Sequence, residues 1–538
     1  MINWSPGWRD EIWSALDQNY DLIVIGGGIT GGGIFLEAVR AGFRTLLLEA
    51  NDFASGTSSR SSKLVHGGFR YLRNGQIGIT YHSVRERERL LHEGRGLINQ
   101  IGFIIASYKR DRIPMWALGL GLTLYDLFAF KWSHKYYPAE KLLDLCPNLN
   151  SEDLIGGYRF LDALTDDARL VLRTIKEGVR RGGYALNYAR VERILHSRSG
   201  KVVGVVVRDM ASANNYEEKP VHAKAVINAT GAWVDELFEE ENHPGTFPVK
   251  RIPRIRRLRG SHLVFSAEKL PLTRAISIWH PKDKRPVFTF PWEGVTLVGT
   301  TDVDYRKKME TDPAISPEEV AYLLQVVNFS FPSLNLIEAD IQSTFSGIRS
   351  VVDTGKKDPS KESREHLFLY NDGLLTVIGG KLTTFHLIAH QALNLLKRKI
   401  PEFHGIDNQP PVTSPPDLKL LIDTPLQTRE AIRLIGRYGQ DSRQLVELAT
   451  HSELLPIEKS GNLWAEIRWA AKYEGILHLE DLLLRRVRIG NILPGGGLSV
   501  IDQVKSIVQE ELNWDNNRWT SEVTSYKNLL AKSFSIIG

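Results

Sequence analysis

The stretch Tyr20-Asp-Leu-Ile-Val-Ile-Gly-Gly-Gly-Ile-Thr-Gly31 joins a short apolar run directly to a glycine-rich segment. The β-branched residues between Leu22 and Ile25 predict a buried parallel strand. Apolar residues from Ile34 to Val39 predict a helix, and Thr45-Leu-Leu-Leu-Glu49 predicts a second strand. A strand–helix–strand unit of about thirty residues is the usual setting of a dinucleotide-binding fold.

Gly26, Gly28 and Gly31 have the spacing of a dinucleotide-binding fingerprint. The first glycine permits a tight turn, the second lets the backbone approach a pyrophosphate, and the third lets helix and strand pack closely. The helix N-terminus adds a partial positive charge for the phosphates. Glu49 follows Gly28 by 49 − 28 = 21 residues and is placed to accept ribose hydroxyls. The glycines alone also fit an ordinary loop, but the two strands and Glu49 favour a cofactor.

Composition excludes several classes of protein. Over 538 residues, 42% are hydrophobic and 24% are charged, which is globular usage rather than disordered or fibrous. The net charge, 68 − 63 = +5, is too small to imply nucleic-acid binding. Cys146 is the single cysteine, which excludes an intramolecular disulfide and a Cys-rich metal site, so we expect no bound metal and a reducing compartment. No secretory signal opens the chain, and no apolar stretch reaches the roughly 20 residues of a membrane span.

Several motifs, in order along the chain, resemble the family of FAD-dependent glycerol-3-phosphate dehydrogenases. The most specific is Gly56-Thr-Ser-Ser-Arg-Ser-Ser-Lys-Leu-Val-His-Gly-Gly-Phe-Arg-Tyr-Leu72. The others are Asp166-Asp-Ala-Arg-Leu170, Asn228-Ala-Thr-Gly-Ala-Trp233, Gly260-Ser-His262, Gly299-Thr-Thr-Asp302, Ser346-Gly-Ile-Arg349, Gly379-Gly-Lys-Leu-Thr-Thr384 and Trp469-Ala-Ala-Lys-Tyr-Glu474. The resemblance covers about residues 21–490.

The resemblance implies an α/β fold in which a Rossmann-like FAD-binding domain is combined with an antiparallel-sheet substrate domain and an all-α C-terminal domain. The boundaries we expect are an N-terminal extension at 1–19, a discontinuous FAD-binding domain at about 20–110, 150–235 and 340–400, an inserted substrate domain at about 236–340, a Pro-rich linker at 402–417, and a helical domain at 418–538.

The resemblance also implies FAD as cofactor and oxidation of sn-glycerol 3-phosphate to dihydroxyacetone phosphate, with electrons passed to a membrane quinone. Beyond the fingerprint and Glu49, it assigns FAD contacts to the following residues: Thr57, Ser58, Ser62, Lys63, Thr230, Gly231, Gly380, Lys381, Leu382 and Thr383. The turn before Lys381 would direct a helix N-terminus at the flavin, where it would stabilise the negative charge of the reduced ring. An ordinary strand–helix turn is the alternative.

A phosphorylated substrate requires concentrated positive charge. The family motifs supply Arg70, Arg349, Arg364 and Lys381 as substrate-binding cations, because arginine bonds two phosphate oxygens at once. Tyr71 and Thr301 are expected to add hydroxyl contacts.

Hydride transfer from substrate C2 to flavin N5 requires a base for the hydroxyl proton. The catalytic candidates are His66, His262, Arg349 and Lys381. Arginine is a poor base because its pKa exceeds about 12. His66 ranks first and His262 second, although His66 in a glycine-rich turn would also suit a role in orienting the flavin.

Three positions depart from the family pattern. His386 stands where an arginine is usual, Ser350 replaces the proline of the Ser-Gly-x-Arg-Pro motif, and Asp162 lies where a Tyr-Asp pair is common. These departures leave the expected phosphate cations intact, but they bear on which substrate is bound.

Two segments suggest contact with a membrane surface. Residues 113–130 carry Asp126 as their one charge among several aromatic residues, which fits either an interfacial helix or a buried core helix. The cation-rich run from Lys250 to Arg259 fits a solvated loop, anionic lipid headgroups or attraction of the substrate. We therefore expect a cytoplasmic protein held peripherally at the inner membrane, and we include a homodimer among its expected assemblies.

The alternative functions are an oxidase that uses oxygen, a flavoenzyme for another 2-hydroxy acid or amine, and a flavin-containing binding or sensing protein without turnover.

Overall fold

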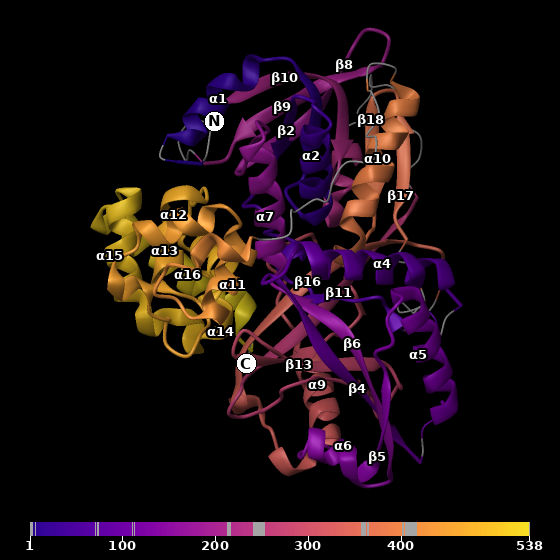
Figure 1. The fold of residues 1–538 in the computed structure, drawn as a ribbon. Coiled ribbons are helices and arrows are strands. Elements are labelled where there is room, and N and C mark those ends of the chain that lie inside the picture. The colour runs from indigo at the N-terminus through magenta and orange to yellow at the C-terminus, as the bar shows by residue number, and fades with distance from the viewer. Residues whose placement is uncertain are drawn as a thin grey trace.

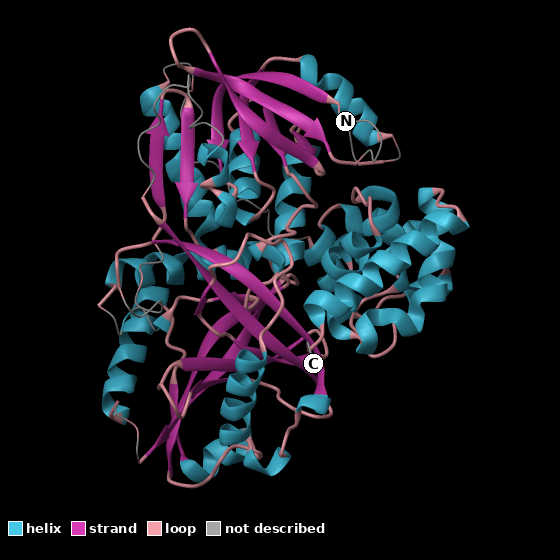
Figure 2. Ribbon diagram, turned by 180° about the vertical axis from the view of Figure 1, so that it is seen from behind, coloured by secondary structure: helices cyan, strands magenta, loops and turns pink. Residues whose placement is uncertain are grey.

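The computed structural model describes the chain except for residues 1–3, 6, 70–71, 73–74, 110, 112, 212–216, 240–252, 357–361, 363–364, 401–402, 404–416 and 537–538. The described residues form two sheets, one above the other in Figure 1, and a helical C-terminal region beside their junction. Figure 2 shows the same arrangement from behind. The predicted fold class, a Rossmann-like α/β domain with an antiparallel sheet and a helical C-terminal region, is confirmed.

The first sheet has the predicted strand–helix–strand unit at its centre. Strand β1 (Tyr20–Ile25) pairs in parallel with β2 (Thr45–Leu48) and β10 (Glu218–Asn228), and helix α2 (Ile29–Arg40) connects β1 to β2. The order is β17-β18-β10-β1-β2-β7, and the hairpin β8–β9 extends from β10. Its other strands are β7 (Tyr184–Leu186), β8 (Ala189–His196), β9 (Val202–Asp209), β17 (Leu367–Asn371) and β18 (Leu374–Ile378). Helices α7 (Asp167–Arg180) and α10 (Phe385–Lys399) pack against α2.

The second sheet is mostly antiparallel and follows the order β15-β11-β14-β13-β12-β4-β6-β3, with β16 on β11 and β5 on β6. Its strands are β3 (Leu64–Val65), β4 (Ile98–Tyr108), β5 (Lys135–Pro138), β6 (Leu154–Thr165), β11 (Ile255–Ser266), β12 (Ala275–Trp279), β13 (Pro286–Trp292), β14 (Val295–Gly299), β15 (Val303–Asp304) and β16 (Ile341–Val352). Helices α4 (Ile77–Glu93), α5 (Met115–Ala129), α6 (Ala139–Leu145) and α9 (Pro317–Ser330) accompany it.

This sheet uses more of the chain than expected. The expected boundaries assigned β4 and β6 to the FAD-binding domain and confined the inserted sheet to about 236–340. In the structure β4 pairs with β6 and then in parallel with β12, so both strands belong to the second sheet. Alternating apolar residues predict a strand, but they do not indicate which sheet the strand joins.

The C-terminal region is helical, as the pattern predicts. It contains α11 (Thr428–Tyr438), α12 (Asp441–Leu448), α13 (Trp464–Tyr473), α14 (Ile489–Ile492), α15 (Ile501–Leu512) and α16 (Asn516–Leu529). Of two further short helices, α1 (Trp8–Ser14) precedes β1 and α8 (Glu236–Glu239) follows β10. Most of the expected linker at 402–417 lies outside the described residues. Within the described part of the chain, no helix combines the length and the apolar character needed to cross a bilayer.

Buried charges join the C-terminal region to the first sheet. Asp52, which follows β2, accepts hydrogen bonds from Arg485 Nε at 2.5 Å and Arg486 Nη2 at 2.7 Å. All three side chains are almost fully buried. Burial alone would raise the pKa of Asp52, but Arg486 and Arg485 outweigh it and lower the pKa to about 2. The contribution of this carboxylate to stability is therefore complete above the unfolded-state pKa of about 3.9 and is lost as the pH falls towards 2.

Replacing Arg486 with Met tests this connection. We expect Arg486→Met to lower the free energy of unfolding by about 3–5 kcal/mol, because it leaves the Asp52 carboxylate buried with fewer partners. Urea unfolding followed by tryptophan fluorescence measures the change. The matched control is Arg443→Met, which removes an exposed pair with Asp423 and should cost about 0–1 kcal/mol. Equal losses in the two variants would contradict the assigned importance of the buried pair.

Candidate active site

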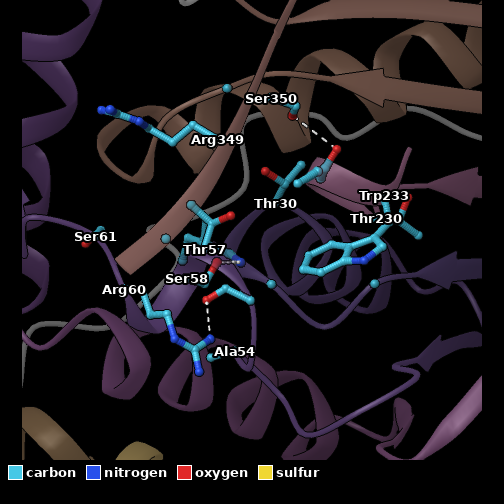
Figure 3. Close-up of a pocket in the computed structure, with 18 of the residues that line it drawn as sticks. Thr30, Ala54, Thr57, Ser58, Arg60, Ser61, Thr230, Trp233, Arg349 and Ser350 are labelled. Atoms are coloured by element: carbon cyan, nitrogen blue, oxygen red, sulfur yellow. Dashed lines mark hydrogen bonds between the residues drawn. The ribbon is translucent and has the colours of Figure 1, made fainter. Parts of the chain in front are cut away.

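One cavity of about 650 Å³ lies between the first and second sheets and collects most of the predicted site residues. It opens at the carboxyl ends of β1, β10 and β18, where α/β sheets bind their ligands. The predicted residues that line it are Gly26, Gly28, Glu49, Thr57, Ser58, Ser62, His66, Thr230, Gly231, His262, Arg349, Gly380, Lys381, Leu382 and Thr383. Figure 3 shows Arg349 and Ser350 on strand β16, across from Thr57 and Ser58 of the Gly56–Leu72 segment.

The fingerprint glycines lie where backbone and cofactor must come close. Gly28 is the N-cap residue of α2 and borders the cavity, and a Cβ there would lie 3.1 Å from Ser58 Oγ. Gly31 does not line the cavity, and a Cβ at this position would overlap the Gly26 carbonyl oxygen. Its role is therefore the close packing of helix on strand. Ser58 Oγ accepts a hydrogen bond from the Ile29 N–H at 3.0 Å, which holds the serine segment beside the start of α2.

Glu49 has the position expected for a ribose-binding acid. Its carboxylate lines the cavity and accepts hydrogen bonds from the Gly27 N–H at 2.7 Å and the Asn51 N–H at 2.8 Å. Burial raises the pKa of Glu49, while these two N–H groups oppose that shift. The acid, the glycine turn and the size of the cavity together fit a bound FAD.

Some side chains of the serine-rich segment line the cavity, and others are buried in the core. Ser62 Oγ lies 2.9 Å from His262 Nε2 at the cavity wall, and Thr57 Oγ1 donates to the Ile348 carbonyl. Lys63, which was expected to contact the cofactor, does not line the cavity. Its Nζ is fully buried, lies 2.9 Å from Asp167 Oδ1, and has its pKa lowered to about 8 by burial. Lys63 therefore holds the segment in place from behind.

The predicted catalytic residues Arg349, Lys381, His66 and His262 all line the cavity. Arg349 Nη2 donates to Asp302 Oδ1 at 2.9 Å and to the Thr301 carbonyl at 3.2 Å. Lys381 Nζ lies 3.5 Å from Ser83 Oγ, and the His66 N–H donates to Thr383 Oγ1 at 3.2 Å. The first two contacts hold the Arg349 and Lys381 side chains, and the third fixes the His66 backbone beside the segment that follows the Gly380 turn.

His262 is buried among cations. Burial, and then the nearby Lys63 and Arg349, lower the pKa of His262 well below its ordinary value. The ring stacks on Phe345 with centroids 4.6 Å apart, and Nδ1 has no hydrogen-bond partner among the described residues. His262 is thus neutral at physiological pH.

Some predicted residues do not line the cavity or cannot be placed. Thr301 is buried behind it, where its Oγ1 donates to Glu319 Oε1 at 2.6 Å. Arg70, Tyr71 and Arg364 lie outside the described residues. Of the departures from the family pattern, Ser350 lines the cavity, whereas His386 does not.

Sequence reasoning missed Arg60 and Trp233, which also line the cavity. Arg60 donates to the Thr311 carbonyl at 2.9 Å, and burial lowers its pKa to about 9. Arg60 and Trp233 both belong to the family motifs quoted above, and this membership could have identified them as candidate site residues.

Comparisons with known proteins agree with this geometry. Residues 21–386 match the family model "FAD dependent oxidoreductase", and residues 390–519 match "C-terminal domain of alpha-glycerophosphate oxidase". The chain is 33% identical over 511 residues to an aerobic glycerol-3-phosphate dehydrogenase of Staphylococcus epidermidis, covering 89% of this chain and 88% of that one. A relative with the same description from Staphylococcus aureus is 32% identical, with 87% of each chain covered.

Solved structures show the same fold. The glycerol-3-phosphate dehydrogenase from Bacillus halodurans complexed with FAD has a TM-score of 0.77 at 27% identity, covering 99% of this chain and 98% of that chain. The L-alpha-glycerophosphate oxidase from Mycoplasma pneumoniae with FAD bound has a TM-score of 0.56 at 18% identity, covering 73% of this chain and 99% of that chain, and shares the fold.

The Gly28 position can be tested directly. We expect Gly28→Ala to weaken FAD binding by about tenfold or more, because the added Cβ would crowd Ser58 Oγ at the cavity border that a pyrophosphate would have to approach closely. The ratio of flavin to protein absorbance after dialysis measures the loss. Gly78→Ala in helix α4, where a Cβ would have open space, is the matched control and should keep its flavin. Full FAD content in Gly28→Ala would refute this role for Gly28.

Proposed function

The chain belongs to the family of FAD-dependent glycerol-3-phosphate dehydrogenases, and from this premise we propose that it oxidises sn-glycerol 3-phosphate to dihydroxyacetone phosphate and passes the electrons to a membrane quinone. FAD is the cofactor, and when bound it accepts the hydride from the substrate carbon. The proposal is carried by one observation. Gly26 and Gly28 of the dinucleotide-binding fingerprint line the same cavity as the catalytic candidates His66, His262, Arg349 and Lys381.

The phosphate is the group that these cations would bind. Arg349 is held by Asp302 through Nη2, and about a quarter (26%) of its side chain remains exposed in the pocket region. A guanidinium fixed in this way can bond two phosphate oxygens, whereas Lys381 supplies a compact positive charge. We also propose Arg70 and Arg364 as phosphate-binding cations.

The proton of the substrate hydroxyl requires a base. We assign this role first to His66, which lines the cavity, and second to His262. The lowered pKa of His262 supports this order, because a histidine whose protonated form is strongly disfavoured is a weaker base at neutral pH. His262 instead suits a positioning role through its contact with Ser62.

An exposed apolar surface supports the membrane part of the proposal. One face of helix α5 packs in the core through Leu118, Leu122 and Tyr125. The alternative of a buried core helix for this segment therefore holds for one side of the helix. The other side and the residues after it expose large apolar groups. These are Trp116 at 72%, Leu120 at 65%, Leu127 at 57%, Phe130 at 78% and Trp132 at 67%. We name this set the α5 surface.

Cations border the α5 surface, as an anionic membrane would require. The Arg85 guanidinium lies 5.0 Å from the centre of the Phe130 ring, and Lys135 is a nearby exposed cation. By contrast, the basic run at 250–259 is less suited to lipid. Its described cations form ion pairs with carboxylates; they are Arg254, Arg256, Arg257 and Arg259.

A glycerol-3-phosphate oxidase is the second candidate function, because the C-terminal family model carries the description of an alpha-glycerophosphate oxidase. The two candidates differ in the acceptor. Comparing the yield of hydrogen peroxide with the reduction of a quinone analogue separates them, and a high peroxide yield with no quinone reduction would overturn the dehydrogenase proposal.

Anaerobic addition of substrate tests the activity and the role of Arg349. We expect glycerol 3-phosphate to bleach the flavin absorbance of the FAD-loaded chain, and glycerol at the same concentration to leave it unchanged. Arg349→Ala should keep FAD but raise the half-bleaching concentration about 10- to 100-fold, because a hydrogen bond to a charged group contributes roughly 1.5–3 kcal/mol.

The control for this experiment is Arg398→Ala, which removes an exposed cation of helix α10 and should behave as the wild type. Unchanged bleaching in Arg349→Ala would remove Arg349 from the substrate site. Absence of bleaching in the wild-type chain would instead favour a flavin-containing sensing protein without turnover.

Vesicle binding tests the α5 surface. We expect the pair of changes Trp116→Ser and Leu120→Ser to weaken sedimentation with vesicles of anionic phospholipid by about tenfold or more, because each apolar side chain contributes roughly 1.5–3 kcal/mol on burial. Ile422→Ser, at a site that is 79% exposed in the C-terminal region, is the matched control. Equal vesicle binding in all three proteins would exclude the α5 surface as the contact.

A further inference from the structure

Behind the cavity, one carboxylate and two histidines from different helices face one another. Glu37 lies in the last turns of α2, and His386 and His390 lie one turn apart on α10. Glu37 and His386 are buried, and the His390 side chain is 26% exposed. None of the three lines the cavity described above. Two histidines at positions i and i+4 of a helix, with a carboxylate opposite, form a donor set that zinc sites use.

The donor atoms lie at separations close to those of ligands around a tetrahedral metal ion. His386 Nε2 and His390 Nε2 are 3.0 Å apart, His386 Nε2 is 3.5 Å from Glu37 Oε1, and His390 Nε2 is 3.4 Å from Glu37 Oε2. Ligands bonded to Zn²⁺ at about 2.0–2.2 Å in a tetrahedron lie about 3.4 Å from one another. One donor atom from each of Glu37, His386 and His390 lies within 4.8 Å of the donor atoms of the other two, so the three groups converge on one small region.

One buried oxygen of this cluster has no hydrogen-bond partner among the described residues. Arg40 Nη1 donates to Glu37 Oε1 at 2.7 Å, but Glu37 Oε2 is fully buried and has no hydrogen-bond partner among the described residues. Arg89 contacts His386 Nδ1, and arginine can only donate. The neutral His386 ring therefore carries its proton on Nε2, directed towards Glu37 and His390. An unpartnered buried carboxylate oxygen is costly, and a bound cation would satisfy it.

We propose that Glu37, His386 and His390 bind a divalent transition-metal ion of the zinc type. Imidazole and carboxylate donors suit Zn²⁺, whereas Mg²⁺ requires an octahedral set of oxygen ligands. Water would supply the fourth ligand through the exposed side of His390. This inference goes beyond the proposed function, and it replaces the expectation from composition that the chain binds no metal.

Binding would shift the proton of His386 from Nε2 to Nδ1 without releasing it. Nδ1–H can no longer accept from Arg89, so Arg89 must withdraw, which its 27% exposed side chain allows. Glu86 Oε2 lies 3.8 Å from His386 Nδ1 and has no hydrogen-bond partner among the described residues. It is placed to accept the new N–H, as the outer carboxylate partner of a metal-bound histidine.

The ion would cross-link two helices that both begin at the cavity. Helix α2 starts after Gly28, and α10 follows the Gly380–Lys381 turn. A ligand that binds the folded state and not the unfolded state stabilises the folded state. The metal is therefore expected to stabilise the cofactor-binding helices, without taking part in oxidation.

Calorimetry on the FAD-loaded, tag-free chain, treated with a chelator and desalted, tests the proposal. We expect the wild type to bind one Zn²⁺ per chain and to give no heat with Mg²⁺. His390→Ala and Glu37→Gln should lose this binding, and Glu86→Gln should weaken it roughly 10- to 100-fold, as loss of an outer partner does. His92→Ala, an exposed histidine of the neighbouring helix α4, is the matched control and should bind as the wild type does.

Saturating Zn²⁺ should also raise the unfolding temperature of the wild type and of His92→Ala, but not that of His390→Ala. Flavin content and circular dichroism establish that each variant is folded. No Zn²⁺ uptake by the wild type, or uptake that is unchanged in both His390→Ala and Glu37→Gln, would overturn the proposal. If either His390→Ala or Glu37→Gln fails to fold, the titration of the wild type and of the other variant still tests the proposal.

Discussion

The ion pairing of buried Asp52 with Arg485 and Arg486 is the interaction on which the geometry of the site depends. Asp52 lies between Glu49 and the serine segment that borders the cavity. Placing its charge in the core is costly, and the two guanidinium groups of the C-terminal region offset that cost. Because these groups come from opposite ends of the chain, the docked C-terminal helices help to fix the segment after β2, whose residues Glu49, Ala50 and Asn51 line the cavity.

The same principle extends along the serine segment. The Ser59 carbonyl accepts hydrogen bonds from Lys63 Nζ at 3.0 Å and from Arg488 Nη2 at 3.1 Å. Lys63 in turn pairs with Asp167 at the start of α7. A loop rich in glycine and serine has little apolar surface of its own to fix it. Buried charges hold it instead, which explains why a lysine in the most specific motif of the sequence pairs with Asp167 and does not line the cavity.

The sequence predicted the elements that are defined by local pattern. The apolar run before Gly26, the glycine spacing and Glu49 predicted the first strand–helix–strand unit and its place at the cavity. Long-range pairing was not predictable in this way. Strand β4 joins β12, more than 160 residues away, and no local pattern specifies that partner. Thr301 and Lys63 were assigned to the site from their motifs, but burial directs them to Glu319 and Asp167.

Part of the positive charge of the site is already paired before any substrate enters. Asp302 accepts from Arg349 at 2.9 Å and lies 3.5 Å from Arg285, so one carboxylate orients two guanidinium groups. Burial, and then the positive charges of Lys63 and Arg349, lower the pKa of the neighbouring His262. A dianionic phosphate entering this space would meet fixed positive charge with little reorganisation. Glycerol, which has the same hydroxyls without the phosphate, gains nothing from that field. Under the proposed function, this charge arrangement would favour a phosphorylated substrate over glycerol.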